Sequence, residues 1–273
     1  MRLRALTLTA GLLGLAGGAG CGSCNDGGFD AAVPDGRPAG GTFSLGWTLS
    51  DQSSGQPVTC DKLDPNATVF VTASREGTGG LESFSCKNMQ ATSAGRFAPG
   101  LYNFTFELHI PAPDGQVQTI ATAPAQSAVA IPSGRDVALA PVAFQVNATG
   151  ALQIRLLAGA GANCPGISGF AISLEHAGGP GDTGCAPVVF TLSGGGTYNA
   201  NNCSAPAVGR CIESSETLSV ASLPSGPYQI HVTGKKVTAD CWSNNDMLRV
   251  PPQGAVFNQS LNLALASENP GCQ

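Results

Sequence analysis

Charged residues are scarce in this chain: Asp, Glu, Lys and Arg together make up 11% of its 273 residues, against roughly a quarter in ordinary soluble domains. The 13 Lys and Arg residues form no cluster and are outnumbered by 18 Asp and Glu residues, giving a net charge of -5. Binding to a phosphate backbone needs concentrated positive charge, so nucleic acid is not a predicted partner. The hydrophobic content of 42% is still sufficient for a packed core.

Residues that commonly carry catalysis or bind metals are also few. The sequence has only three histidines, no Gly-x-Ser-x-Gly nucleophile elbow, and no phosphate-binding loop ending in Gly-Lys-Ser/Thr. The cysteines beyond residue 24 lie eight or more positions apart, which does not fit the short ligand spacing of a zinc site. We therefore predict no metal and no cofactor, and favour a protein that is not an enzyme.

Beyond the first 20 residues the sequence lacks long apolar runs and sustained helical periodicity, whereas Gly (37) and Pro (19) are abundant. Short segments alternate between apolar and polar residues instead. In one of them Phe43, Leu45, Trp47 and Leu49 occupy every second position, which places Trp47 in the core. The sequence predicts an all-β protein built from antiparallel β-sandwiches of immunoglobulin-like or transthyretin-like shape.

Residues 1–20 have the organisation of a signal peptide, with Arg2 and Arg4 followed by sixteen uncharged residues. The small residues before Cys21 resemble the lipobox of bacterial lipoproteins, and this resemblance implies cleavage before Cys21 and lipid attachment to it. Residues 21–41 are rich in Gly, Pro and Asp and are predicted to be a flexible tether. The alternative is plain secretory cleavage without acylation. If Cys21 is acylated, Cys24 is left without an obvious partner.

An internal repeat divides the remainder into predicted domains at 42–146 and 147–273. The stretch Phe97–Leu108 matches Leu223–Val232, with the Gly and Tyr residues of each in register. Each copy has the order apolar strand, Cys, strand, Cys, turn and Tyr-containing strand. The Leu-Pro-Ser-Gly-Pro-Tyr segment resembles the signature of carboxypeptidase regulatory-like and prealbumin-like modules of bacterial surface proteins. That resemblance implies a β-sandwich fold and carries no activity with it.

The eight cysteines of the two copies are interpreted as structural disulfides of an exported protein. Six of them lie in the second copy and allow 15 pairings, so the repeat is used to choose among them. The second copy also contains an insertion at about 178–203. The predicted pairs are Cys60 with Cys86, Cys164 with Cys211, Cys185 with Cys203, and Cys241 with Cys272.

One segment is a candidate contact with a ligand. Trp242 lies between Asp240 and Asp246 in a polar stretch that we interpret as a loop, where an exposed indole could stack on a sugar or anchor a partner protein. Packing of Trp242 against the neighbouring disulfide is the alternative.

The leading hypothesis is a non-enzymatic lipoprotein of the bacterial cell envelope, on its periplasmic or surface face, acting as a structural or protein- or glycan-binding module. Its partners would be the membrane, through the N-terminal lipid, and a protein or carbohydrate ligand. The second hypothesis is a secreted hydrolase or enzyme accessory domain with its site in the loops of the second copy.

Overall fold

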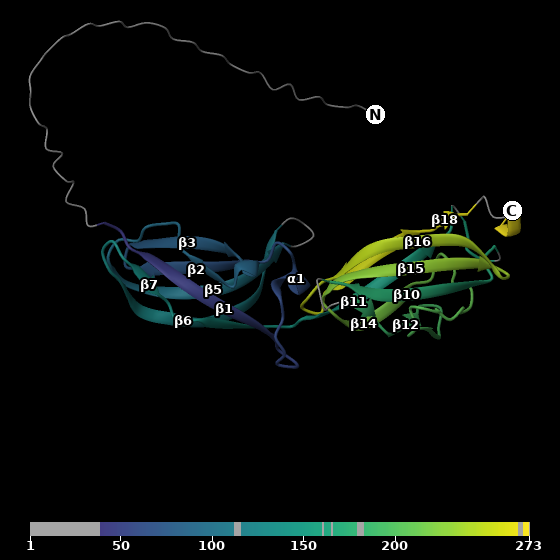
Figure 1. Cartoon of the computed structure of the whole chain (residues 1–273), viewed down its shortest axis with the longest axis horizontal. Helices are drawn as coiled ribbons and strands as arrows, with labels where there is room; N and C mark the ends of the chain where they lie inside the picture. The colour runs from purple at the N-terminus through teal and green to yellow at the C-terminus, as the bar shows by residue number, and fades with distance from the viewer. Residues whose placement is uncertain are drawn as a thin grey trace, which may run out of the picture. The chain divides into compact units, whose positions relative to one another are not determined.

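The computed structural model describes residues 39–111, 116–159, 161–164, 166–178, 183–266 and 270–272. The predicted signal peptide, Cys21, Cys24 and most of the predicted tether lie outside these residues. Strands dominate the described part, and its single α-helix, α1 (Cys60–Leu63), has four residues (Figure 1). No described helix has the length and hydrophobicity that crossing a membrane requires. The predicted all-β class is confirmed.

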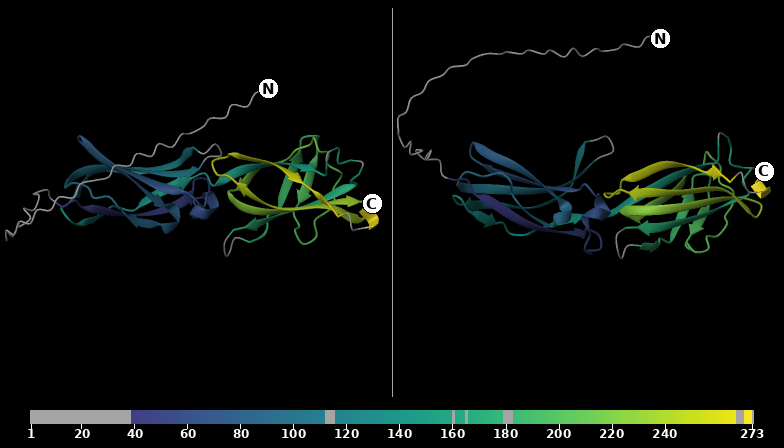
Figure 2. Two further views of the ribbon diagram at one scale, coloured as in Figure 1. Left: turned by 90° about the horizontal axis from the view of Figure 1, so that it is seen from above. Right: turned by 45° about the horizontal axis from the view of Figure 1, so that its top comes forward.

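In the first sandwich, two four-stranded sheets pack face to face (Figure 2). One sheet has the order β3-β2-β5-β6, and the other is built around β1, which pairs with β4, β7 and β8. The strands are β1 (Thr42–Asp51), β2 (Thr68–Arg75), β3 (Thr78–Ser85), β4 (Gln90–Thr92), β5 (Gly100–Pro111), β6 (Val117–Ile131), β7 (Asp136–Ala138) and β8 (Val142–Val146).

The core of the first sandwich contains residues from Phe43 to Val146. As alternation predicted, every second side chain of β1 points into it. Trp47 is only 2% exposed, its ring lies 6.2 Å from that of Phe84, and its indole N–H donates to the carbonyl of Cys86 at 3.0 Å. The indole therefore fills the core beside the Cys60–Cys86 disulfide.

The second sandwich has two five-stranded sheets, with the orders β11-β10-β15-β16-β18 and β13-β12-β14-β9-β17. Its own core contains residues from Leu152 to Leu263. The strands are β9 (Thr149–Leu157), β10 (Gly169–Ala177), β11 (Thr183–Cys185), β12 (Val188–Leu192), β13 (Thr197–Ala200), β14 (Leu218–Pro224), β15 (Gly226–Lys236), β16 (Ala239–Val250), β17 (Val256–Asn262) and β18 (Ala264–Leu265).

The sheets are antiparallel except where the first strand of each sandwich meets its last strands. β1 pairs in parallel with β7 and β8, and β9 pairs in parallel with β17. Each sandwich closes with two short strands instead of one continuous strand: β7 and β8 in the first, and β17 and β18 in the second. In the first case the break falls at residues 139–141, where Pro141 cannot donate to a ladder and Leu139 turns into the core.

Four disulfides join the cysteines in the predicted pairs. Two of the bridges, those formed by Cys60 and by Cys241, have both of their cysteines buried. In a third, Cys185 is exposed. The bridges are Cys60–Cys86, Cys164–Cys211, Cys185–Cys203 and Cys241–Cys272, spanning 26, 47, 18 and 31 residues of sequence.

The repeat seen in the sequence has a counterpart in hydrogen bonding. The hydroxyl of Tyr102 donates to the carbonyl of Ala98 at 2.9 Å, and that of Tyr228 donates to the carbonyl of Pro224 at 2.8 Å. Both rings are buried, so each sandwich fixes the turn that precedes its Tyr strand through the same bond four residues back along the chain.

We expect Tyr102→Phe and Tyr228→Phe each to lower the free energy of unfolding by about 1 kcal/mol, because each leaves a carbonyl without its donor while keeping the buried ring. Urea denaturation followed by far-ultraviolet circular dichroism measures the loss. A Phe104→Leu variant, which alters packing but touches no such bond, serves for comparison. Equal stability of the Tyr→Phe variants and the parent would contradict the assigned role.

Asp51 ends β1 with a carboxylate that accepts four hydrogen bonds. Ser53 and Ser54 donate through their hydroxyls at 2.5 and 2.7 Å, the Ser54 amide donates at 2.9 Å, and the Ala148 amide donates at 3.0 Å. These donors, the Ser53 hydroxyl first among them, stabilise the charged form and hold the pKa of Asp51 well below its usual range. The residue is 8% exposed.

Acid should therefore remove stability at Asp51. Because its pKa is depressed in the folded state, the contribution is complete above the unfolded-state pKa of about 4 and is lost as the pH falls below it towards the lower folded value. Unfolding free energies measured between pH 6 and pH 2 should fall less steeply for Asp51→Asn than for the parent. Parallel pH profiles of the two proteins would count against this assignment.

Candidate functional site

The three predicted ligand contacts lie on strand β16, which corrects their assignment to a loop. Trp242 is paired with Gly234 and Asp246 with Ile230 of the neighbouring strand β15. Backbone hydrogen bonds define this strand, and they form equally well beneath polar side chains, so a run of Ser, Asn and Asp concealed it. A bulge between Gly234 and Lys235 also breaks the regular alternation at this point.

The side chains of these three residues are already engaged. Trp242 is half-buried and packs against the second core, with Leu265 of β18 opposite it. Asp240 forms an ion pair with Lys235, and Asp246 accepts a hydrogen bond from the Gln259 amide at 3.3 Å. The placement of Trp242 agrees with the alternative of packing, and the role of the three residues in ligand contact stays a prediction.

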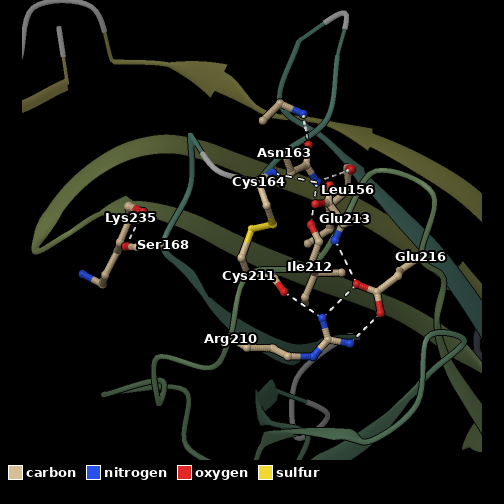
Figure 3. Close-up of a disulfide and its surroundings, with 11 residues drawn as sticks. Leu156, Asn163, Cys164, Ser168, Arg210, Cys211, Ile212, Glu213, Glu216 and Lys235 are labelled. Atoms are coloured by element: carbon tan, nitrogen blue, oxygen red, sulfur yellow. Dashed lines mark hydrogen bonds and ion pairs between the residues drawn. A yellow bond between two sulfur atoms is a disulfide. The ribbon is translucent and has the colours of Figure 1, made fainter.

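The Cys164–Cys211 disulfide joins the loop between β9 and β10 to the segment between β13 and β14 (Figure 3). Beside the bridge, Asn163 is 2% exposed and fully satisfied: its amide nitrogen donates to the carbonyls of Leu156 and Ile212 at 2.8 and 2.9 Å, and its oxygen accepts from the Ala158 amide at 3.0 Å. This residue could not be recognised from the sequence, because an Asn next to a Cys in a Gly-rich stretch looks the same as a solvated turn residue.

A bidentate ion pair fastens the other side of these loops. The Arg210 guanidinium contacts both carboxylate oxygens of Glu216, at 2.9 and 2.5 Å, and also donates to the Cys211 carbonyl (Figure 3). Hydrogen bonding to Arg210 lowers the pKa of Glu216 and raises that of Arg210. Both groups stay charged and use their hydrogen bonds on each other. The pair therefore orders the loops and offers no free acid or base.

One histidine makes two polar contacts but does not fit a proton relay. His109 stacks on Phe70 with ring centroids 4.3 Å apart, and its side chain is 15% exposed, so it is more covered than a surface histidine. Its Nε2 contacts both Glu107 (2.7 Å) and Thr119 (3.0 Å), whereas Nδ1 is buried without a partner. A relay needs the acid and the nucleophile on opposite nitrogens. In the described ranges no three His, Cys, Asp or Glu residues gather to hold a metal.

Among the grooves of the described structure, two are taken as candidate binding surfaces. One, of about 660 Å³, lies between the edges of β6 and β8 and is lined only by uncharged residues. There the Gln126 side-chain amide donates to the Ala140 carbonyl and accepts from the Ala140 amide, as a neighbouring strand would. The other, of about 300 Å³, lies over β9 and β17 and is lined by Gln153, Arg155, Thr217, Asn258, Gln259 and Ser260.

The insertion of the second copy forms short strands and carries the Cys185–Cys203 bridge. β11 pairs with the end of β10, and β13 pairs with β12 in the other sheet. The Tyr198 hydroxyl of β13 donates to the Ala207 carbonyl at 2.6 Å and accepts from the Ile172 amide at 2.7 Å. Residues 179–182 of the predicted insertion lie outside the described residues. The described part of the insertion consists of paired strands and polar groups with hydrogen-bond partners.

Comparison with known proteins gives only distant similarities. No protein-family model matches the chain, and no curated protein matches it. Similar solved structures include the Bacillus anthracis TIE protein (13% identity, TM-score 0.33, 83% of this chain and 34% of that chain) and a putative adhesin from Bacteroides ovatus (8%, 0.31, 84% and 90%). The shaft pilin SpaA from Lactobacillus rhamnosus GG is another (10%, 0.27, 85% and 100%). The chain spans about a third of the length of the Bacillus anthracis protein.

Proposed function

We propose that this chain is a lipid-anchored protein of the bacterial cell envelope whose two disulfide-bonded β-sandwiches act as a non-enzymatic structural or binding module. The observation that carries the proposal is the set of four disulfides, distributed over both sandwiches. Disulfides form and persist outside the reducing cytosol, which supports export. The lipobox-like residues before Cys21 supply the anchor in this proposal.

The polar groups of the described loops support a scaffold more than a reaction centre. Asn163 has all three of its hydrogen bonds within the fold, and Arg210 and Glu216 satisfy each other. An active site needs groups whose protonation or bonding is left open for a substrate. The exposed strand faces and the two grooves are the surfaces that a partner protein or glycan would meet.

Mass spectrometry of the protein extracted from membranes tests both parts of the proposal. The expected species begins at Cys21 and carries a diacylglyceryl group, and reduction adds eight protons for the four bridges. The matched variant Cys21→Ser should keep all four bridges and leave the membrane fraction. A protein that retains residues 1–20 and whose thiols react freely without reductant would refute the proposal.

A further inference from the structure

We propose that the first sandwich is a force-bearing link, built so that tension along the chain loads its terminal strands in shear. The inference rests on the proposed anchoring, because it treats the N-terminal side of the sandwich as the side that is held. Any pull on the second sandwich reaches the anchor through the covalent chain, entering the first sandwich at Val146 and leaving it at Thr42.

The direction of this load follows from the parallel pairing of β1 with β7 and β8. Three register pairs join β1 to β7 and five join it to β8. Because the strands are parallel, Thr42 and Val146 lie at opposite ends of the ladder. Pulling them apart slides one strand along the other, so the hydrogen bonds are strained together. In an antiparallel arrangement with both chain ends on one side, the same pull would open the bonds one at a time.

Further bonds extend the ladder at both of its ends. At the start of β1 the Thr42 amide donates to the Arg135 carbonyl at 3.1 Å, and beyond its end the Gln52 amide donates to the Val146 carbonyl at 2.7 Å. The Asp51 carboxylate then accepts from the Ala148 amide, the second residue after β8. The point where the load enters is therefore held by a charge-assisted hydrogen bond as well as by the ladder.

The disulfides decide which other parts of the chain carry tension. In the first sandwich the Cys60–Cys86 bridge shields 26 residues from tension but involves neither β1 nor β8. The ladder of β1 with β7 and β8 therefore still carries the load. In the second sandwich a pull on the C-terminal residue passes from Cys272 directly to Cys241 of β16. That bridge removes β17 from the path, although β17 pairs in parallel with β9 over seven residues. For such a pull the shear geometry operates in the first sandwich.

The lengths released on unfolding identify the two sandwiches in a pulling experiment. Thr42 to Val146 is 105 residues, of which the bridge withholds 26, leaving 79 residues or about 280 Å of extended chain. Thr149 to Cys272 is 124 residues, of which two bridges withhold 47 and 31, leaving 46 residues or about 165 Å. Every event can therefore be assigned.

Single-molecule pulling of the unacylated mature chain, with Cys21 and Cys24 replaced by serine and a handle at each end, tests the inference. The backbone amides of β1 point alternately to its two neighbouring strands. The Trp47 amide donates to the Met89 carbonyl on the β4 side, so the next amide, that of Thr48, points to β8. Thr48→Pro, at an exposed position, should lower the force of the 79-residue event several-fold. Thr72→Pro, also exposed but on β2 in the other sheet, should leave that force close to the parent value.

A second geometry tests the inference without removing a hydrogen bond. A clickable residue in place of exposed Gln56 puts the handle beside the Val146 end of the ladder, so pulling from there unzips β1. The force should again be several-fold lower than for pulling from the N-terminus. Equal forces in the two geometries, or equal losses for both proline variants, would overturn the inference. Either result would leave the anchoring proposal intact, because anchoring is measured separately by mass.

Discussion

Replacing Cys164 and Cys211 together by alanine should lower the free energy of unfolding of the second sandwich by about 3.5 kcal/mol. The bridge spans 47 residues, but Cys185–Cys203 already closes a loop of 18 of them. Removing the bridge therefore increases the conformational entropy of the unfolded chain by that of a loop of about 29 residues. Guanidinium denaturation followed by Trp242 fluorescence in a Trp47→Phe background measures the change.

The tryptophans make a control possible, because each sandwich contains one of the two in the chain. Removing Cys60 and Cys86 instead should leave the Trp242 transition unchanged in the Trp47→Phe background, and should shift the Trp47 transition in a matching Trp242→Phe background. If loss of Cys164 and Cys211 left the Trp242 transition in place, the bridge would not be constraining the second sandwich.

Trp47→Ala should destabilise the first sandwich by roughly 3–5 kcal/mol, the range for removing a buried aromatic side chain and leaving a cavity. The indole is 2% exposed, stacks near Phe84 and donates to the Cys86 carbonyl. Calorimetry should show the transition of the first sandwich at lower temperature. Trp242 then reports the second sandwich, which should unfold as in the parent.

Trp47→Phe separates packing from hydrogen bonding at this site. It keeps most of the buried ring but removes the donor to Cys86, so we expect a loss of about 1–2 kcal/mol. A loss for phenylalanine as large as that for alanine would mean that the hydrogen bond, and not the filled volume, dominates.

The features that the sequence predicted well are those recorded in local patterns. Alternation placed Trp47 in the core, and the repeat paired Cys60 with Cys86 and Cys164 with Cys211, because equivalent loops approach equivalent segments in each copy. Tyr102 and Tyr228 stood in register in the sequence and make the same hydrogen bond in the structure. Each of these signals lies within a short window or is stated twice in the chain.

The features that escaped prediction depend on contacts between distant segments. Parallel pairing of β1 with β8 joins residues about 95 apart, and no local pattern encodes which edge a strand meets. Strand β16 was hidden because its partner β15 supplies the backbone bonds while its own side chains are polar. Asn163 was missed for a similar reason, since its three partners come from segments up to 49 residues away.

Strand β6 affects how copies of this chain meet one another at high concentration. Its fifteen residues, Val117–Ile131, include no charged side chain, and in the described structure it pairs on one side only, with β5. Such an edge can ordinarily form backbone hydrogen bonds with the same edge of an adjacent molecule. Here Pro124 withholds a donor, and Ala128, with a φ of 55°, sits at an irregularity in the ladder. Many copies could therefore stand side by side at high density without fusing into a shared sheet.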